Sequence, residues 1–555
     1  MKVCGKFFAA LKKAVMRQPF VVSKQFYVVT ALAHHGIINE GWKGGILIME
    51  EKIKYTEYIK SMDTSEVSRC YICHDPVCTK VCPQKAPVGD ILRSFYFENY
   101  IGAIEKIGNT DCTYCNAPCE KACVLKNDGI PIRIGRLNME LAASSKYLPE
   151  KRIEEVDLSA EICGIKLDNP FLLSSSVVSS TYDMCKRAFE AGWAGASFKT
   201  ICNFPQHEAS PRFSAIRSHA NSFCGFKNIE QLSDHSVEEN MEIFRKLREE
   251  FPTKVIVASI MGQNEAEWTT LAAKCEQAGA SVIECNFSCP NMESDSLGIT
   301  IGQSEELVEK FTRAAKKGTS LPVLAKLTPN ITDMVPLALA AKRGGADGIS
   351  AINTINSITG VDIDTLVAQP AVQGKSIVGG YSGPAVKPIA LRFISDLNGC
   401  EDLKGLHISG MGGIETWRDA LEFMLLGAGS VQITTAVMQY GYRIIDDLIQ
   451  GLAEYMKRKG IASIKDLVGG ASRTVVDHRS IERDTIVFPV INTDLCNGCG
   501  RCYVSCMDGG HQAIEFDPET RKPKLNGSRC VGCHLCRLVC RTGAIGVAPK
   551  AIHRP

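Results

Sequence analysis

The cysteines carry most of the chemistry that this sequence suggests. The chain has 555 residues and 25 cysteines, of which eight lie between Cys70 and Cys123 and eight between Cys496 and Cys540. Thiolates at such short spacing are typical of metal or iron–sulfur ligands, whereas disulfides belong mainly to secreted chains. Because the N-terminal segment lacks a cleavage site typical of a signal peptide, we expect a protein of the reducing cytoplasm whose cysteines hold iron.

The C-terminal cysteines have the most specific spacing. Two runs of the form Cys-x2-Cys-x2-Cys-x3-Cys predict a ferredoxin-like domain with two [4Fe-4S] clusters, in which the fourth cysteine of each run ligates the other cluster. Zinc is the alternative. Met507 and Arg541 stand where a proline usually follows each run, which we expect to alter the local turn and not the ligation. The predicted ligand sets are Cys496, Cys499, Cys502 and Cys540 for one cluster and Cys530, Cys533, Cys536 and Cys506 for the other.

A second cysteine-rich segment lies near the N-terminus. Its eight thiolates, in two groups separated by a stretch with helical periodicity, match two four-iron clusters with four ligands each. Two zinc sites are the alternative, although an x4 spacing and a Cys-Pro pair are less usual for zinc. The two groups are Cys70-x2-Cys73-x4-Cys78-x3-Cys82-Pro83 and Cys112-x2-Cys115-x3-Cys119-x3-Cys123.

A single cysteine in the middle of the chain suggests acid catalysis. Cys289 follows the apolar run Val282-Ile283 within Asn286-Phe287-Ser288-Cys289-Pro290-Asn291. A thiol at a strand end can donate a proton if the loop that carries it covers a substrate. The alternative is a buried structural cysteine, because free cysteine is among the most buried residue types.

The middle of the chain alternates β-rich runs with helical patterns. Segments such as 266–278, 305–315 and 416–426 have apolar residues three and four apart. Eight such β/α repeats over about 250 to 300 residues predict a TIM barrel, whose active site lies at the C-terminal ends of the strands. A doubly wound sheet is the alternative, but no GxGxxG follows an early strand. The predicted strands are 171–175, 196–200, 255–260, 282–287, 323–327, 348–353, 406–409 and 430–434.

Polar residues or glycines stand at six of the predicted strand ends. The last two ends offer backbone N–H groups and hydroxyls at the usual phosphate position of a TIM barrel, with two ordinary tight turns as the alternative. A phosphate site together with strand-end lysines suggests FMN, because a lysine near the ring would stabilise the negative charge of the reduced flavin. The residues are Lys199, Asn286 to Cys289, Lys326, Asn353 and Thr354, Gly412 and Gly413, and Thr434 and Thr435.

This region resembles the FMN barrel of dihydroorotate dehydrogenases and dihydropyrimidine dehydrogenases. The pyrimidine enzymes match better, above all the catalytic subunits of their bacterial NAD-dependent form. The motifs are 169–171, 198–200, 227–230, 286–291, 325–330, 353–354, 380–383 and 412–414. The resemblance implies pyrimidine binding by Asn228, Asn286, Ser288, Asn353 and Thr354, catalysis by Cys289 as proton donor together with Lys326, and flavin contacts by Lys199, Lys326, Ser382, Gly383, Gly412, Gly413, Thr434 and Thr435.

The N-terminal cysteines resemble those of the helical iron–sulfur domain of dihydropyrimidine dehydrogenases and of the small glutamate synthase subunit. The resemblance implies one cluster on Cys70, Cys73, Cys78 and Cys123 and another that includes Cys82, Cys115 and Cys119. The family's fourth ligand to the second cluster is a Gln or Glu, and Asn138 stands at the matching position. Asn is one methylene shorter, so either Asn138 or Cys112 completes this cluster.

These features predict an α/β oxidoreductase built around a (β/α)8 barrel of the dihydroorotate dehydrogenase type. The predicted parts are an unassigned extension (1–48), a helical iron–sulfur domain (49–150), the FMN barrel (151–465), and a linker with a two-cluster ferredoxin-like domain (466–555). The expected reaction is reduction of the 5,6 double bond of uracil or thymine, with hydride from FMN to C6 and a proton from Cys289 to C5. A dihydroorotate dehydrogenase-like enzyme, another ene-amide reductase and an electron-transfer subunit are the alternatives.

The sequence also bounds the partners. No Rossmann fingerprint is found in it, so we expect electrons from a separate NAD(P)H-oxidising flavoprotein or a ferredoxin, within a homo- or hetero-oligomer. The 63 basic and 61 acidic residues give a formal charge of +2, which argues against a nucleic-acid partner. No run approaches the roughly 20 apolar residues of a membrane span.

Overall fold

The computed structural model describes residues 64–204, 206–218, 222–292 and 297–553. The extension predicted over 1–48 therefore lies outside the described residues. The chain divides into two compact units, the first ending at Ser472 and the second beginning at Arg473. Within the described ranges, no helix has both the length and the apolar composition that crossing a membrane requires.

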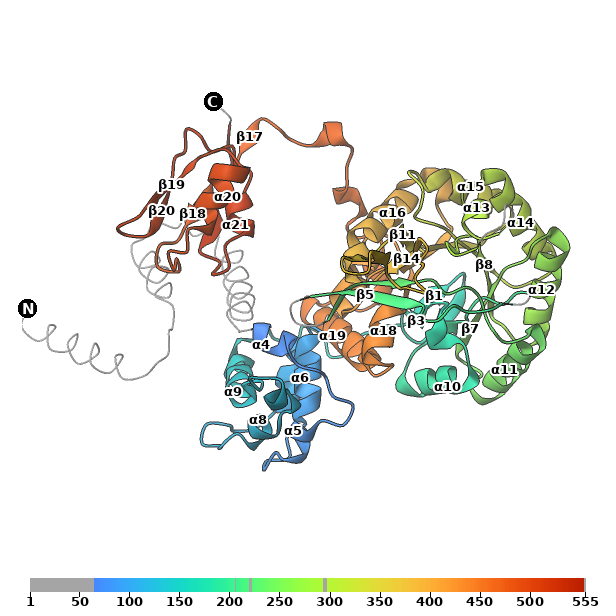
Figure 1. Cartoon of the computed structure of the whole chain (residues 1–555), viewed down its shortest axis with the longest axis horizontal. Helices are drawn as coiled ribbons and strands as arrows, with labels where there is room; N and C mark the ends of the chain where they lie inside the picture. The colour runs from blue at the N-terminus through green and yellow to red at the C-terminus, as the bar shows by residue number, and fades with distance from the viewer. Residues whose placement is uncertain (1–63, 205, 219–221, 293–296, 554–555) are drawn as a thin grey trace, which may run out of the picture. The chain divides into compact units, whose positions relative to one another are not determined.

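Eight parallel strands close into a barrel in the first unit, which confirms the predicted fold class (Figure 1). Six of them end one to three residues earlier than predicted, because the residues predicted at their ends do not pair with a neighbouring strand and instead begin the loops. In barrel order the strands are β10 (Gly348–Ala351), β15 (His407–Met411), β16 (Ser430–Ile433), β3 (Phe171–Leu173), β4 (Gly195–Ser197), β7 (Val255–Ile260), β8 (Val282–Asn286) and β9 (Val323–Lys326).

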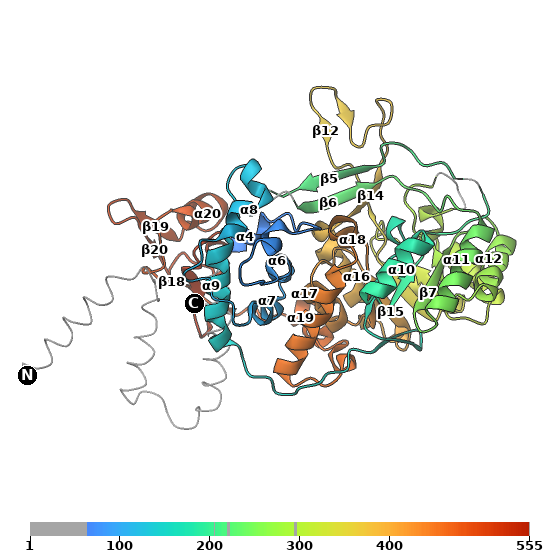
Figure 2. The same cartoon turned by 90° about the horizontal axis from the view of Figure 1, so that it is seen from below.

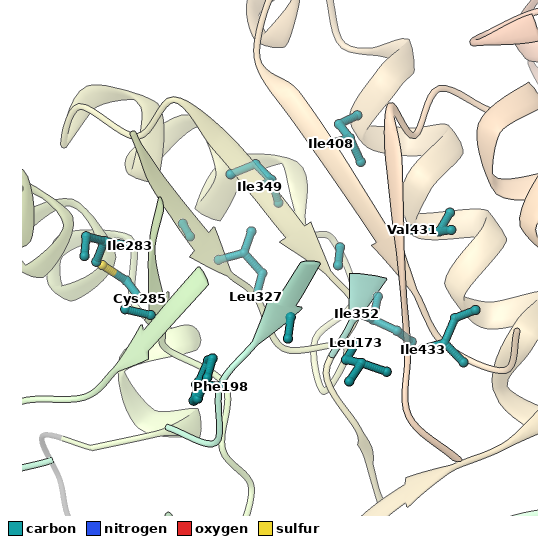
Figure 3. Packing of buried hydrophobic residues seen from close by; sticks show 14 of the residues in the cluster. Leu173, Phe198, Ile283, Cys285, Leu327, Ile349, Ile352, Ile408, Val431 and Ile433 are labelled. Atoms are coloured by element: carbon teal, nitrogen blue, oxygen red, sulfur yellow. The ribbon is translucent and has the colours of Figure 1, made fainter. Parts of the chain in front are cut away.

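Helices surround the barrel and bury the outward face of each strand. Successive side chains of a strand point to opposite faces, so Ile283 and Cys285 of β8 pack among helix residues, and Figure 3 shows both in the buried apolar layer. Glu284 lies between them and points inward, to the barrel interior. The helices are α10 (Tyr182–Ala191), α11 (Val237–Glu250), α12 (Glu265–Gln277), α14 (Glu305–Lys317), α15 (Val335–Arg343), α16 (Lys387–Gly399), α17 (Trp417–Leu425), α18 (Thr435–Tyr440) and α19 (Ile444–Lys459).

A short hairpin fills the opposite end of the barrel from the predicted site. Its strands are β1 (Ala160–Ile162) and β2 (Ile165–Leu167), which pair antiparallel. Their buried residues share one apolar cluster with inward side chains near the starts of the barrel strands. This end of the barrel is therefore closed by packing, and the other end is left for ligands.

A four-stranded antiparallel sheet, which the sequence did not predict, adds a wall beside the barrel mouth (Figure 2). Its order is β11 (Ile355–Ser357), β14 (Gly379–Ser382), β6 (Phe223–Asn228) and β5 (Phe213–Arg217). Gly380 pairs with Asn228, and Ser382 pairs with Phe226. The sheet thereby brings Asn228 and Ser382, which are distant in sequence, to the same place. A further hairpin of β12 (Val361–Asp362) and β13 (Val367–Ala368) lies in the same insertion.

The cysteine-rich helical segment packs against the last helices of the barrel. Asp447 of α19 is fully buried and pairs with Arg93 (Nε to Oδ2, 2.7 Å), and it accepts hydrogen bonds from Ser94 and Asn99. Trp417 Nε1 donates to the carbonyl of Glu98 (3.0 Å). The segment consists of α4 (Thr64–Ser68), α5 (Val77–Lys80), α6 (Val88–Tyr96), α7 (Tyr100–Ile107), α8 (Pro118–Ala122) and α9 (Ile134–Ser144).

The second unit is a small domain of short strands and two helices. The helices α20 (Arg501–Gly509) and α21 (Leu535–Leu538) each carry cysteines of the predicted ferredoxin runs. The strand pairs are β17 (Thr485–Ile486) with β22 (Ile552–His553), β18 (Pro489–Ile491) with β21 (Ile545–Val547), and β19 (Ile514–Asp517) with β20 (Lys522–Leu525).

Candidate active site

A buried carboxylate forms the floor of the barrel mouth. Glu284 is fully buried, and its Oε1 lies 3.5 Å from Lys326 Nζ. Ser197 donates to the same oxygen (3.1 Å), while Ser350 (3.0 Å) and Gln432 (3.3 Å) donate to Oε2. Every one of these side chains points inward from a barrel strand. Both carboxylate oxygens are thus satisfied, as a charge in a low-dielectric interior requires.

Lys326 connects this floor to the cavity above it. Its side chain is 3% exposed, and besides its pair with Glu284 it donates to Ser174 Oγ (3.4 Å). It also lines the cavity at the C-terminal ends of the strands. The ammonium group therefore has a fixed partner below and an open side facing the cavity. A cation so placed can stabilise negative charge on a ring bound over it.

The cavity brings together residues that the sequence scatters over more than two hundred positions. All the predicted binding and catalytic residues of the barrel line it except Ser288, which is fully buried behind the wall. The lining members of the prediction are Lys199, Asn228, Asn286, Cys289, Lys326, Asn353, Thr354, Ser382, Gly383, Gly412, Gly413, Thr434 and Thr435.

One wall of the cavity is a chain of hydrogen-bonded amides. Asn286 Nδ2 donates to Thr200 Oγ1 (2.9 Å), and Asn286 Oδ1 accepts from Ser288 Oγ (3.0 Å). Asn353 Nδ2 in turn donates to Ser288 Oγ (2.8 Å), and its Oδ1 accepts from the backbone N–H of Thr354 (2.7 Å). Ser288 therefore orients two amides. Fixed amides present both donors and acceptors to a ligand edge.

Cys289 lies in the same wall and is 6% exposed. The backbone carbonyl of Cys289 accepts from Ile299 N (3.0 Å), which anchors the loop that carries it. Burial raises the pKa of the Cys289 thiol to about 11. A raised pKa keeps the protonated form at neutral pH, so this cysteine is suited to be an acid and not a nucleophile.

Lys199 pairs with different carboxylates from the one that pairs with Lys326. Its Nζ donates to Glu208 Oε1 (2.9 Å) and lies 3.8 Å from Glu230 Oε1. Burial raises the pKa of Glu230, and the charge of Lys199 opposes that shift. Both cations of the described cavity lining, Lys199 and Lys326, are therefore paired with carboxylates of the protein.

The far end of the cavity is built from glycines and hydroxyls. Gly412 and Gly413 have φ values of +125° and +78°, and a Cβ on Gly413 would lie 2.8 Å from the carbonyl oxygen of Gly383. The hydroxyls of Ser382 and Thr435 are 2.9 Å apart. The loop thus comes closer to its neighbours than any other residue type allows, and it presents backbone groups at the position where barrels of this kind bind phosphate.

Sequence reasoning missed several members of this site. Glu284 was not predicted as a site residue because it lies within a strand, although a lone carboxylate in an apolar run indicates an inward position. Asn291 and Tyr381 also line the cavity, and although they lie in recognised motifs neither was assigned a role; Ser174 has no distinctive motif, and Glu415 follows the glycine loop. Glu208 was missed because its segment has no recognisable pattern. Only the fold shows that it meets Lys199.

The C-terminal cysteines surround two cavities of the second unit. One cavity is lined by Cys496, Cys499, Cys502 and Cys540, and the other by Cys506, Cys530, Cys533 and Cys536. These are the two crossed sets that the spacing predicts. Four thiolates around one cavity are the donor set that a [4Fe-4S] cluster takes.

The N-terminal cysteines also fall into two groups. Burial raises the pKa of Cys70 to about 12, and the nearby thiols of Cys73, Cys78 and Cys123 add to the shift. Cys112 interacts with Cys82 and Cys115, and Cys119 interacts with Cys112 and Cys115.

Asn138 and Cys112 meet in the second group. Asn138 is 2% exposed, and its Nδ2 lies 4.0 Å from Cys112 Sγ. Its Oδ1 is buried and has no hydrogen-bond partner among the described residues. Both alternatives for the fourth ligand therefore lie at the same place.

Family models match three segments of the chain. Residues 157–456 match the model described as dihydroorotate dehydrogenase, and residues 489–547 match a 4Fe-4S dicluster domain. Residues 49–147 match dihydropyrimidine dehydrogenase domain II, 4Fe-4S cluster.

Three relatives each match more than half of the chain. The chain is 54% identical over 389 residues to the NAD-dependent dihydropyrimidine dehydrogenase subunit PreA of Escherichia coli. The matched region covers 70% of the chain and 95% of that protein. It is 35% identical to the chloroplastic dihydropyrimidine dehydrogenase (NADP(+)) of Arabidopsis thaliana, over 63% of the chain and 83% of the relative. It is 39% identical to the catalytic subunit of dihydroorotate dehydrogenase B (NAD(+)) of Pyrococcus horikoshii, over 56% of the chain and 97% of the relative.

The Glu284–Lys326 pair makes a testable contribution to stability. Replacing Glu284 by Ala would leave the Lys326 ammonium buried without its counter-ion, and we expect a loss of about 3 to 5 kcal/mol in the free energy of unfolding of the barrel. Ser350→Ala removes one neutral donor from the same carboxylate and should cost only about 1 kcal/mol. Urea unfolding of both variants measures the difference. Equal losses would show that the ion pair adds nothing beyond a hydrogen bond.

Proposed function

The chain belongs to the dihydroorotate dehydrogenase family and is an iron–sulfur oxidoreductase that acts on CH–CH bonds, and we propose that it reduces the 5,6 double bond of uracil or thymine. The observation that carries this proposal is Cys289, a buried thiol with a raised pKa in a wall of fixed amides. Two of its relatives are named as dihydropyrimidine dehydrogenases, which favours the same substrate class here.

The cavity fits FMN. The glycine loop and the Ser382–Thr435 hydroxyl pair offer a cradle for the phosphate, and Lys326 stands where it can meet the ring. When bound and reduced, the flavin supplies the hydride for C6 of the pyrimidine. Lys326 neutralises the negative charge of the reduced ring, and its pair with Glu284 keeps the ammonium in position.

The residues of the protein bind the substrate and deliver the proton. A pyrimidine edge alternates N–H donors and C=O acceptors, which the amides of Asn228, Asn286 and Asn353 can match. Cys289 then donates its proton to C5, and the resulting thiolate takes a new proton from solvent. Hydride at C6 and proton at C5 together complete the reduction of the double bond.

A dihydroorotate-like substrate is the second candidate, because the family includes enzymes of that name. Its carboxylate would call for a cation. Among the described residues that line the cavity, the cations are Lys199 and Lys326. Lys199 is paired with Glu208, and the open side of Lys326 is assigned to the flavin ring, so neither is left for a substrate carboxylate. This favours a neutral pyrimidine.

The proposed electron carriers are four [4Fe-4S] clusters, two in each cysteine-rich part. The C-terminal sets fit because each surrounds its own cavity. All cysteines in the described part of the chain are free, in keeping with iron ligation in a reducing cytoplasm. We also propose the domain limits 49–150, 151–465 and 466–555 for the helical domain, the barrel and the C-terminal part.

The substrate and the acid are tested together. Full-length protein, reduced anaerobically, is mixed with uracil, thymine or orotate, and reoxidation of the flavin is followed by its absorbance. We expect uracil or thymine to reoxidise it rapidly, and Cys289→Ala to abolish the reaction while flavin content and cluster reduction stay normal. Because the acidic form of Cys289 persists below its pKa, the rate per bound flavin should not fall with rising pH until about pH 11 is approached. A near wild-type rate in the Ala variant would refute the assignment.

Electrons are proposed to come from a separate protein. The PreA relative is named as a subunit, and a partner that oxidises NAD(P)H, or a ferredoxin, would complete the chain of electron carriers. The purified protein alone should therefore fail to oxidise NADH or NADPH with uracil present, whereas an artificial one-electron donor should support turnover. Turnover with either nicotinamide nucleotide alone, measured at 340 nm, would contradict the need for a partner.

Cys112 is proposed as the fourth ligand of the second N-terminal cluster, with Asn138 as its hydrogen-bond donor. The 4.0 Å contact between Asn138 Nδ2 and Cys112 Sγ supports this order, because an amide N–H donates to a thiolate. Cys112→Ser should reduce the iron content by one cluster, and Asn138→Ala should keep the iron while changing the reduction potential. Iron analysis and redox titration decide the matter. Loss of iron only in the Asn138 variant would make its free Oδ1 the ligand.

A further inference from the structure

An unpaired carboxyl group lines the cavity two residues after the glycine loop. Glu415 lines the same cavity as Gly413 and Thr435. Its Oε1 is buried and has no hydrogen-bond partner in the described part of the chain. The proposed reaction gives this group no role. A buried polar atom without a partner is costly, so a bound ligand or a proton is expected to satisfy it.

The nearest groups on the barrel leave Glu415 without a cation. Its backbone N–H donates to Asp419 Oδ2 (3.0 Å), and the same carboxylate caps α17 through Thr416. Lys387, the cation beside the glycine loop, is already held by Asp419 (2.6 Å) and Glu422 (2.9 Å). The backbone N–H groups at the start of α17 and the Lys387 ammonium group therefore already have carboxylate partners within the protein.

The groups of α6 and α18 that interact with Glu415 are neutral. Tyr440 of α18 and Tyr96 of α6 interact with it, and their hydroxyls are 2.6 Å apart. Burial raises the pKa of both tyrosines, so neither ionises near neutral pH. Burial, followed by the charge of Asp419, raises the pKa of Glu415 to about 8. Its carboxyl is thus mainly protonated at neutral pH and has a hydrogen to donate.

We propose that protonated Glu415 donates a hydrogen bond to the phosphate of the bound flavin mononucleotide, and that ionisation of Glu415 weakens binding of this nucleotide. The proposal rests on the proposed flavin site. Phosphate oxygens are strong acceptors, and a neutral carboxylic acid supplies a donor without adding charge. A carboxylate at the same place would repel the phosphate dianion across a buried, weakly screened gap. Glu415 is therefore a specificity residue for the phosphorylated flavin.

The test compares two flavins that differ only in the phosphate. Flavin-depleted full-length protein, checked to retain its iron, is titrated with FMN and with riboflavin between about pH 6.5 and about pH 9.5, and binding is followed by quenching of flavin fluorescence. FMN affinity should fall by up to about tenfold per pH unit above about pH 8, because each bound phosphate then requires proton uptake by Glu415. Riboflavin affinity should not show this fall, which controls for ionisation near the ring.

Two variants complete the experiment. Glu415→Gln keeps a donor that cannot ionise, so it should bind FMN at every pH with the affinity that wild type has at neutral pH. Glu422→Gln changes a half-exposed carboxylate on α17, the helix that follows Glu415, and this variant should follow the wild-type profile. A fall retained in the Glu415→Gln variant, or the same fall for FMN and riboflavin, would overturn the proposal. Absence of binding by both flavins would overturn the flavin site itself, and this inference with it.

Discussion

The ion pair between Lys326 and Glu284 is the constraint on which the site depends. An ammonium group in a protein interior must have a counter-charge, and Glu284 supplies it at 3.5 Å. The carboxylate is held in turn by Ser197, Ser350 and Gln432, so the position of Lys326 is fixed from three other strands. A cation fixed this way needs no rearrangement when negative charge develops above it, which is the basis of electrostatic preorganisation.

This arrangement is possible because the closed barrel separates two faces of every strand. In β8 the outward residues Ile283 and Cys285 pack against helices, whereas the inward Glu284 and Asn286 face the floor and the mouth of the barrel. The apolar hairpin β1–β2 fills the opposite end of the interior. Burial of apolar surface thus stabilises the outside and one end of the barrel, and the polar groups are left only where a ligand can use them.

Contacts between the N-terminal cysteine-rich segment and the last barrel helices support the proposed electron path. Within the first unit, Arg443 donates to the backbone carbonyls of Cys73 (3.1 Å) and Ile72, and Tyr96 meets Tyr440 at the other end of the helix that starts with Thr435. The segment that carries Cys70 therefore contacts the start of α19 through Arg443, and α6 contacts the end of α18 through Tyr96. Buried Asp447 joins α19 to α6 through Arg93.

The sequence by itself determined the elements of this protein and the residues at their ends. Local spacing and alternation along the chain predict the two cysteine patterns, the eight strands and the strand-end residues. Cys289, Lys326 and Gly412–Gly413 could be predicted because strand ends of a barrel converge. Ligand spacing alone also predicted the crossed C-terminal cysteine sets that line the two cavities.

The tertiary structure decided what those residues meet. The pairing of Lys326 with Glu284 and of Lys199 with Glu208, the sheet that brings Asn228 and Ser382 to the cavity, and the buried position of Ser288 depend on contacts between distant segments. Glu415 shows the reason most clearly. Burial is the main cause that raises its pKa, and neither the depth of a side chain nor the absence of a hydrogen-bond partner can be read from local spacing.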